Sequence, residues 1–115
     1  MGQIVCKVMA GLITVREEGR CRRLYFGETM QGGIRLDDPS ACTFPVTEAF
    51  HVIAALRAEP PGRILIIGLG AGELPRSFLK TFPKSIIRVV EIDPVVVQLA
   101  RRYFALPHNK RRLAV

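Results

Sequence analysis

Between residues 63 and 94 the pattern of hydrophobic positions predicts a strand, a helix and a second strand. The aliphatic run at residues 64–67 is continuous, which is typical of a parallel strand covered on both of its faces. Apolar side chains recur at every fourth position over residues 73–82, which predicts a helix, and Pro83 is expected to end it. The second buried strand is expected at residues 86–90.

Ahead of this unit, shorter patterns predict a small antiparallel β-hairpin unit. Its strands are expected at residues 11–15, 22–26 and about 30–36. Gly32 and Gly33 interrupt the third of these strands, which predicts a β-bulge or the close approach of another backbone. The first ten residues lack the continuous apolar core of a secretory signal, so we expect no such signal there.

A helix is predicted between the β-hairpin unit and the first parallel strand, over residues 47–57. Its expected packed face consists of Ala49, Ile53 and Leu56. Glu48 and His51 lie one helical turn apart, and the sequence leaves open whether they reach a substrate, because exposed pairs at this spacing are common.

After the second strand, Asp93 is expected to cap a helix that has Pro94 at its first position. This gives Asp93 a structural role, so we do not count it among the ligand-binding residues. Residues 112–115 have the pattern of a third strand beginning, and we therefore expect the chain to be an incomplete piece of a larger enzyme. The predicted organisation is an antiparallel β unit at 1–43 followed by the first part of a Rossmann-like nucleoside-binding domain at 44–115.

The candidate site lies at the ends of the two parallel strands. Gly68, Gly70 and Gly72 follow the first strand, where the chain must turn sharply and a ligand can approach bare backbone. Glu91 ends the second strand about 20 residues later, where an acidic residue of such folds accepts both hydroxyls of a ribose. The alternative is that the glycines form a turn and nothing more, but the glutamate at this spacing favours a nucleotide-binding site.

The glycine spacing indicates which nucleotide this site prefers. The dinucleotide fingerprint is G-x-G-x-x-G, whereas this chain has G-x-G-x-G with Glu73 at the position of the third glycine. A carboxylate there would repel a diphosphate but not a ligand with a cationic sulfur. We therefore predict a sulfonium nucleoside, S-adenosylmethionine or its decarboxylated form, with NAD as the poorer fit.

Composition narrows the classes of partner. The chain has 115 residues, and its 17 Lys and Arg residues against 10 Asp and Glu residues give a formal charge of +7. Most basic residues are scattered, and no aromatic residues alternate with them as on a surface that stacks single-stranded nucleic acid, so we do not expect a nucleic-acid partner. No apolar stretch reaches roughly eighteen residues, so no membrane span is expected.

The cysteines and histidines give no sign of a disulfide or a metal site. Cys6, Cys21 and Cys42 are odd in number and lack C-x-x-C spacing, so we expect reduced thiols in a cytoplasmic protein. His51 and His108 are too few and too far apart to predict a metal site.

Four segments together resemble spermidine synthase and its relatives, the polyamine aminopropyltransferases. They are EEGRCRRLYFGETMQ, TEAFH, IIGLGAGELPR and VEIDPVVVQLARRYF. The resemblance covers most of the chain and implies a Rossmann-like, S-adenosylmethionine-dependent methyltransferase fold, here partial, behind a small N-terminal β-domain. It also implies that Gly68, Gly70 and Gly72 form the family's glycine-rich loop and that Glu91 is its ribose-binding glutamate.

The chain departs from the family pattern at three places. Ala71 stands where the family has an aspartate that binds an amine, and Val46 and Thr47 replace a tyrosine and a glutamine or histidine ahead of Glu48. A glutamine that helps to hold the nucleoside corresponds to Ala10. The resemblance places the family's catalytic aspartate and adenine-binding aspartate beyond residue 115, so no catalytic residue is named.

The resemblance to this family and the departures from it lead to three candidate functions. The leading one is a spermidine synthase-like transferase that binds S-adenosylmethionine or its decarboxylated form and transfers an aminopropyl group to a polyamine by in-line displacement. The first alternative is a class I S-adenosylmethionine-dependent methyltransferase, which the loss of the amine-binding aspartate favours. The second is a non-catalytic relative that binds a nucleoside or a protein. The expected partner is a small-molecule acceptor, and self-association into a homo-oligomer is left open.

Overall fold

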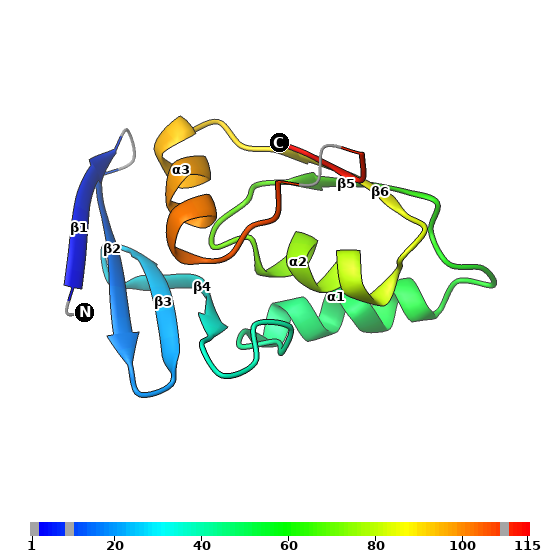
Figure 1. Ribbon diagram of the computed structural model, residues 1–115, viewed down its shortest axis with the longest axis horizontal. Coiled ribbons are helices and arrows are strands. Elements are labelled where there is room, and N and C mark those ends of the chain that lie inside the picture. Colours follow the sequence, from blue (N-terminus) through cyan, green and yellow to red (C-terminus); the bar gives the residue numbers. More distant parts are fainter. Residues whose placement is uncertain (1–2, 9–10, 109–110) are drawn as a thin grey trace.

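The computed structural model describes residues 3–8, 11–108 and 111–115, which form two β-sheets and three helices (Figure 1). In chain order the elements are β1 (Gln3–Val8), β2 (Gly11–Glu18), β3 (Cys21–Phe26), β4 (Thr29–Arg35), α1 (Pro45–Ala55), β5 (Arg63–Ile67), α2 (Glu73–Thr81), β6 (Ile86–Val90), α3 (Pro94–Tyr103) and β7 (Leu113–Ala114). The first sheet has the antiparallel order β1-β2-β3-β4 and the second the parallel order β5-β6-β7. Figure 1 shows the two sheets at opposite ends of the molecule with α3 between them.

The first sheet is larger than the sequence predicted. β1 pairs with β2 along its whole length, and the pattern of the first ten residues did not indicate this strand. β2 also extends to Glu18, because the turn to β3 is made by Gly19 and Arg20 alone. Gly19 has a φ of +63°, a left-handed conformation that favours glycine.

The bulge predicted in β4 is present. Leu24 on β3 lies opposite Gly32, but the next residue, Tyr25, lies opposite Met30. Gln31 is therefore the additional residue on the bulged strand, and the register shifts at this point. Bulges of this kind change the direction in which a side chain points.

The second sheet confirms the predicted strand, helix and strand, and the third strand expected near the end of the chain. Ile67 at the end of β5 pairs with Val90 at the end of β6, and β7 joins β6 with Leu113 opposite Ile87. α2 connects β5 to β6, and its Phe78 is buried.

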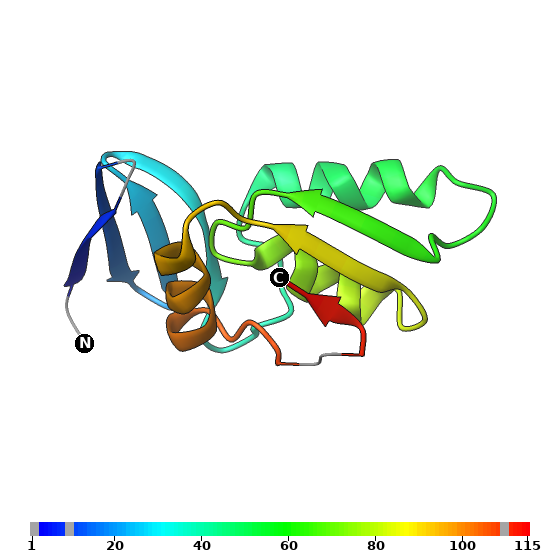
Figure 2. The ribbon, with the colours of Figure 1, turned by 90° about the horizontal axis from the view of Figure 1, so that it is seen from above.

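One expectation for β5 was wrong. Its aliphatic run predicted cover on both faces, but Leu65 is 66% exposed and Ile67 is 83% exposed, while Ile64 and Ile66 are half-buried. The described helices α1 and α2 lie on one face of the sheet, and Figure 2 looks onto the other face, which no described helix covers.

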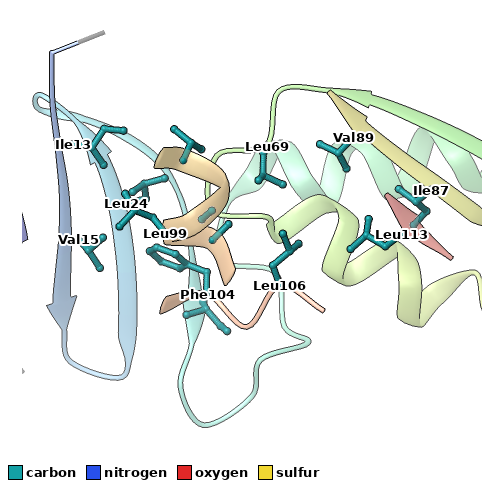
Figure 3. Close-up of a cluster of buried hydrophobic side chains, with 14 of the residues drawn as sticks. Ile13, Val15, Leu24, Leu69, Ile87, Val89, Leu99, Phe104, Leu106 and Leu113 are labelled. Carbon is teal, nitrogen blue, oxygen red and sulfur yellow. The ribbon is translucent and has the colours of Figure 1, made fainter. Parts of the chain in front are cut away.

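A continuous hydrophobic core joins the two sheets (Figure 3). Its first-sheet members are Ile13, Val15, Leu24 and Ile34, and its α3 members are Val96, Leu99 and Ala100, followed by Phe104. Phe104 is fully buried. The predicted boundary at residues 43 and 44 lies in the connection from β4 to α1, and the division into two domains stays a prediction.

The start of α3 is as predicted. The Asp93 carboxylate accepts a hydrogen bond from the Val95 amide at 2.9 Å, with Pro94 in the first turn. Val96, Leu99 and Ala100 are buried, whereas Arg101 and Arg102 are exposed.

The packed face of α1 is not the one expected. Thr47 is buried and His51 and Ala54 are half-buried, while Ile53 is 62% exposed and Leu56 is 81% exposed. Apolar residues occur on both sides of this helix, so its periodicity did not identify the packed face. Half-buried His51 is accommodated because Ser77 on α2 offers a partner, with Ser77 Oγ 2.8 Å from His51 Nε2.

We expect stability to decrease as the pH falls through about 6.5, the ordinary pKa of histidine. Burial lowers the pKa of His51, so the unfolded chain binds this proton more readily than the folded one. Denaturant unfolding at about pH 7.5 and about pH 5.5 measures the effect. His51→Gln should reduce the difference, and the control His108→Gln, at an exposed position, should retain it. Equal pH dependence in the two variants would exclude His51 as the cause.

Candidate functional site

The ends of β5 and β6 lie side by side, as the candidate site requires. The Gly68 amide donates a hydrogen bond to the Val90 carbonyl at 2.7 Å, directly beyond the last paired residues of the two strands. Glu91 follows Val90, and its Oε2 accepts a hydrogen bond from the Leu69 amide at 2.9 Å. The predicted glycine turn and the predicted glutamate are therefore in direct contact.

The Glu91 carboxylate keeps capacity for a ligand. Besides the Leu69 amide, it accepts a hydrogen bond from the Asp93 amide at 3.1 Å through Oε1. A carboxylate has about four acceptor positions, and each Glu91 oxygen, which accepts from one backbone amide, therefore has room for a second donor. Two hydroxyls on neighbouring carbons match this arrangement.

A cavity of about 300 Å³ opens beside the turn. It is lined by Phe26, Gln31, Phe44, Val46, Thr47, Gly68, Leu69, Gly70, Ala71, Glu73, Leu74 and Glu91. The first sheet, the start of α1 and the glycine turn each supply part of this lining. The cavity therefore lies where the two halves of the chain meet.

The three predicted glycines have different surroundings. Gly68 (φ +91°) and Gly70 (φ +55°) line the cavity. Gly72 (φ +72°) does not line it and is the N-cap residue of α2, where an added Cβ would lie 3.0 Å from Leu106 Cδ1. The structure thus gives Gly72 a packing role that the sequence did not indicate.

We expect Gly70→Ala to lower the free energy of unfolding by about 1–2 kcal/mol, because a Cβ disfavours the left-handed conformation. It would also lie 3.1 Å from the Gln31 carbonyl oxygen. Gly27→Ala is a matched control, since Gly27 has a φ of +57° and open space around its Cβ position. Denaturant unfolding should show a larger loss of unfolding free energy for Gly70→Ala than for Gly27→Ala. Equal losses would show that the contact with Gln31 does not contribute.

Gln31 is a polar cavity residue that the sequence analysis missed. It is the bulged residue of β4, and its Nε2 donates only a long hydrogen bond, 3.5 Å, to the Thr29 carbonyl. The sequence signal that could have pointed to Gln31 is the pair Gly32 and Gly33, which predicted the bulge next to it. The residue assigned to the family's nucleoside-binding glutamine, Ala10, lies outside the described residues.

Glu73 borders the cavity, but its carboxylate is already engaged. The residue is 5% exposed and accepts four hydrogen bonds, from Gly33, Phe44 and both the amide and the hydroxyl of Thr43. Four bonds fill the acceptor positions of a carboxylate. Glu73 therefore contributes negative charge beside the turn without a free position for a ligand.

The other residues singled out in the sequence are placed as follows. Ala71, Val46 and Thr47, which replace polar groups of the family, all line the cavity. Glu48 and His51 do not, and they border a separate cavity of about 270 Å³ beside α2. Glu48 and His51 are therefore not part of the candidate site.

Glu91 also lines another cavity, of about 390 Å³, which we call the second cavity; the cavity beside the glycine turn is the first. Its other lining residues are Ile92, Pro94, Val97, Gln98, Arg101 and Val115. Ile92 is 85% exposed, so its side chain offers apolar surface next to the carboxylate. Glu91 thus stands between the second cavity and the cavity beside the glycine turn.

Other kinds of site find no support in the described part of the chain. Over residues 3–8, 11–108 and 111–115 there is no group of three histidine, cysteine or acidic residues that could hold a metal ion. None of the helices described is long and apolar enough to span a membrane.

Comparison with known proteins identifies relatives of this arrangement. No family model matches the chain. The polyamine aminopropyltransferase of Chromobacterium violaceum is 35% identical over 98 residues, 84% of this chain and 37% of that protein. That of Neisseria meningitidis is 30% identical over 104 residues, 90% of this chain and 40% of that protein. The chain therefore spans about two fifths of the length of these curated relatives.

A solved structure has the same fold. A probable spermidine synthase from Corynebacterium glutamicum superposes with a TM-score of 0.81 over 100% of this chain and 44% of its own. Its sequence identity of 22% supports the fold alone. The fold and the relatives' sequences point the same way. The chain belongs to the spermidine synthase-like family. The predicted α/β, Rossmann-like methyltransferase fold is confirmed for the part that this family member spans.

Methyltransferases share part of this family member's sequence and fold. The eEF1A lysine and N-terminal methyltransferase of Bos taurus is 41% identical over 56 residues, 49% of this chain and 8% of that protein. The structure of human methyltransferase-like protein 13 in complex with SAH has a TM-score of 0.54 and 36% identity over 61% of this chain and 34% of its own.

Proposed function

We propose that the chain carries the nucleoside-binding part of a spermidine synthase-like transferase. Its co-substrate would be decarboxylated S-adenosylmethionine or S-adenosylmethionine itself, and its reaction the transfer of an aminopropyl group to a polyamine. The observation that carries this proposal is Glu91, whose carboxylate has two acceptor positions left and stands between two cavities.

The two cavities suit the two ends of such a ligand. With both ribose hydroxyls on Glu91, the base would lie toward Ile92 and Val97, which line the second cavity. The sulfonium group and its chain would lie along Gly68 and Gly70, in the first cavity. The backbone there can approach closely because neither residue has a side chain.

The charges of the first cavity favour the decarboxylated form. Glu73 and Glu91 both border it, and none of the described residues that line it is basic. A ligand with a sulfonium, an amine and no carboxylate is attracted by two carboxylates, whereas the carboxylate of S-adenosylmethionine would be repelled.

In the proposed reaction, the acceptor amine attacks the carbon next to the sulfonium sulfur. A carbon–nitrogen bond forms, and the carbon–sulfur bond breaks with its electron pair remaining on the thioether. The amine proton passes to a base, and no described residue is assigned that role. The contribution of this chain is positioning, which in well-oriented reactions is worth roughly 7–11 kcal/mol.

Methyl transfer is the second candidate function. Ala71 provides no carboxylate to bind an amine, which removes one feature expected of a polyamine site. The similarity to the Bos taurus methyltransferase and to human methyltransferase-like protein 13 supports the same candidate. Both candidates use the Glu91 site in the same way and differ in the group transferred.

Calorimetric titration of the protein with S-adenosylmethionine and with its decarboxylated form distinguishes the two candidate functions. Turnover assays with putrescine as the acceptor follow. Preference for the decarboxylated form together with aminopropyl transfer supports the leading proposal. Binding of S-adenosylmethionine alone supports methyl transfer. Absence of binding to either ligand would overturn both and favour a non-catalytic protein-binding relative.

The cellular location and the partner are also proposals. Among the described cysteines, Cys21 and Cys42 are free thiols, which is the usual state in the cytoplasm. We infer a cytoplasmic protein that acts on a small-molecule acceptor.

A further inference from the structure

Glu73 ties the first turn of α2 to residues that precede α1. Its Oε1 accepts hydrogen bonds from the amides of Thr43 (2.5 Å) and Phe44 (3.1 Å). Its Oε2 accepts from the Thr43 hydroxyl (2.7 Å) and the Gly33 amide (3.3 Å). Phe44 is the N-cap residue of α1, and the Glu73 carboxylate supplies the acceptor for its amide.

Arg76 makes the complementary set of bonds from the same turn of α2. Its guanidinium donates to the carbonyls of Ala71 (2.9 Å), Phe104 (2.7 Å) and Gly33 (2.7 Å). Arg76 is 9% exposed, and although burial lowers its pKa to about 10, it stays charged at neutral pH. Gly33 on β4 is thus held at its N–H by Glu73 and at its C=O by Arg76.

These bonds end next to the cavity wall that faces the glycine turn. We define this facing wall as Gln31, Phe44, Val46 and Thr47, all of which line the first cavity. Gly33 is two residues beyond Gln31, and Phe44 is itself a wall residue. We call the hydrogen bonds of Glu73 and Arg76 the clamp. The clamp also holds the glycine turn, because Arg76 donates to the Ala71 carbonyl and Glu73 follows Gly72 directly.

We propose that Glu73 and Arg76 are positioning residues that set the distance between the facing wall and the glycine turn. They act on the part of the site that would receive the sulfonium chain, whereas Glu91 acts on the sugar. The identity of that ligand rests on the proposed function, but the clamp itself is a property of the chain.

Glu73→Gln tests the clamp at nearly constant volume. Glutamine retains one acceptor oxygen and presents an NH₂ group to the remaining donors, so part of the network is broken. Glu59→Gln is the matched control, because Glu59 is exposed and distant in sequence from the clamp.

Amide hydrogen exchange is the decisive measurement. In Glu73→Gln we expect the Gly33, Thr43 and Phe44 amides to exchange at least about tenfold faster, because the carboxylate that they share becomes a neutral amide with a single acceptor oxygen. The Leu69 and Asp93 amides, which donate to Glu91, should keep their rates. Unchanged rates at the three amides, or an equal rise at all five, would overturn the proposal.

Thr43→Val covers the case in which Glu73→Gln does not fold. It removes only the hydroxyl bond to Glu73 and keeps the shape of the side chain. We expect faster exchange confined to the Thr43, Phe44 and Gly33 amides, by about twofold to fivefold. A change spread over the whole chain, or none at all, would count against the clamp.

Ligand binding separates this proposal from the proposed function. Adenosine, which has the sugar and base alone, should bind Thr43→Val, which keeps the Glu73 charge, within about twofold of the unsubstituted chain, while decarboxylated S-adenosylmethionine should bind at least about fivefold more weakly. An equal loss for both ligands would mean general damage and would overturn the positioning role. If the unsubstituted chain binds neither ligand, the proposed function fails, and the exchange rates alone decide the clamp.

Discussion

Replacing Glu91 with glutamine is expected to weaken binding of the sulfonium nucleoside by about 10- to 100-fold, because hydrogen bonds to a charged acceptor contribute about 1.5–3 kcal/mol. Glutamine has one acceptor oxygen, and its NH₂ group would face either the Leu69 amide or the Asp93 amide. The variant therefore loses both the charge and one of the two places at which a sugar hydroxyl could donate.

Calorimetric titration of the unsubstituted chain, Glu91→Gln and Glu59→Gln measures this effect. Glu59→Gln removes the same charge at an exposed position outside both cavities that Glu91 borders, so it corrects for the change in net charge. Equal affinity in all three proteins would remove Glu91 from the site and, with it, the basis of the proposed function.

Phe104→Ala is expected to lower the free energy of unfolding by about 3–5 kcal/mol, the usual cost of removing a fully buried aromatic ring. Phe104 is 0% exposed and belongs to the core that joins the first sheet to α3 (Figure 3). Its carbonyl also accepts a hydrogen bond from Arg76, so the cavity would form beside the clamp.

Denaturant unfolding followed by far-ultraviolet circular dichroism gives the free energy for this variant. Phe50→Ala is the control: Phe50 is 45% exposed on α1, and its truncation should change stability by no more than about 0.5 kcal/mol. Because the core is shared by both sheets, we also expect one transition for the unsubstituted chain. Two separate transitions would contradict a common core.

The central strand, helix and strand could be predicted because their signals are local. The aliphatic run of β5, the fourfold spacing in α2 and the cap at Asp93 each act within a few residues. Parallel strands that follow each other through one helix also bring their ends to the same edge of the sheet, so the contact between the glycine turn and Glu91 followed from the order of elements.

The remaining features depend on partners distant in sequence. The packed face of α1 is decided by the position of α2, and the exposure of Leu65 depends on what lies over the sheet rather than on β5. Glu73 could be recognised as a departure from the dinucleotide fingerprint, but its role depends on Gly33 and Thr43, at least 30 residues away. Gly72 likewise packs against Leu106, which no local pattern indicates.

The two amides that already hold the Glu91 carboxylate have a consequence for the thermodynamics of association. A side chain fixed in one rotamer before a ligand arrives has little conformational entropy left to lose, which for a flexible residue costs about 0.5–1.5 kcal/mol. A sugar that docks on this carboxylate would therefore meet an acceptor whose orientation is chosen in advance. The unfavourable entropy of docking would then come mainly from the ligand and the displaced solvent.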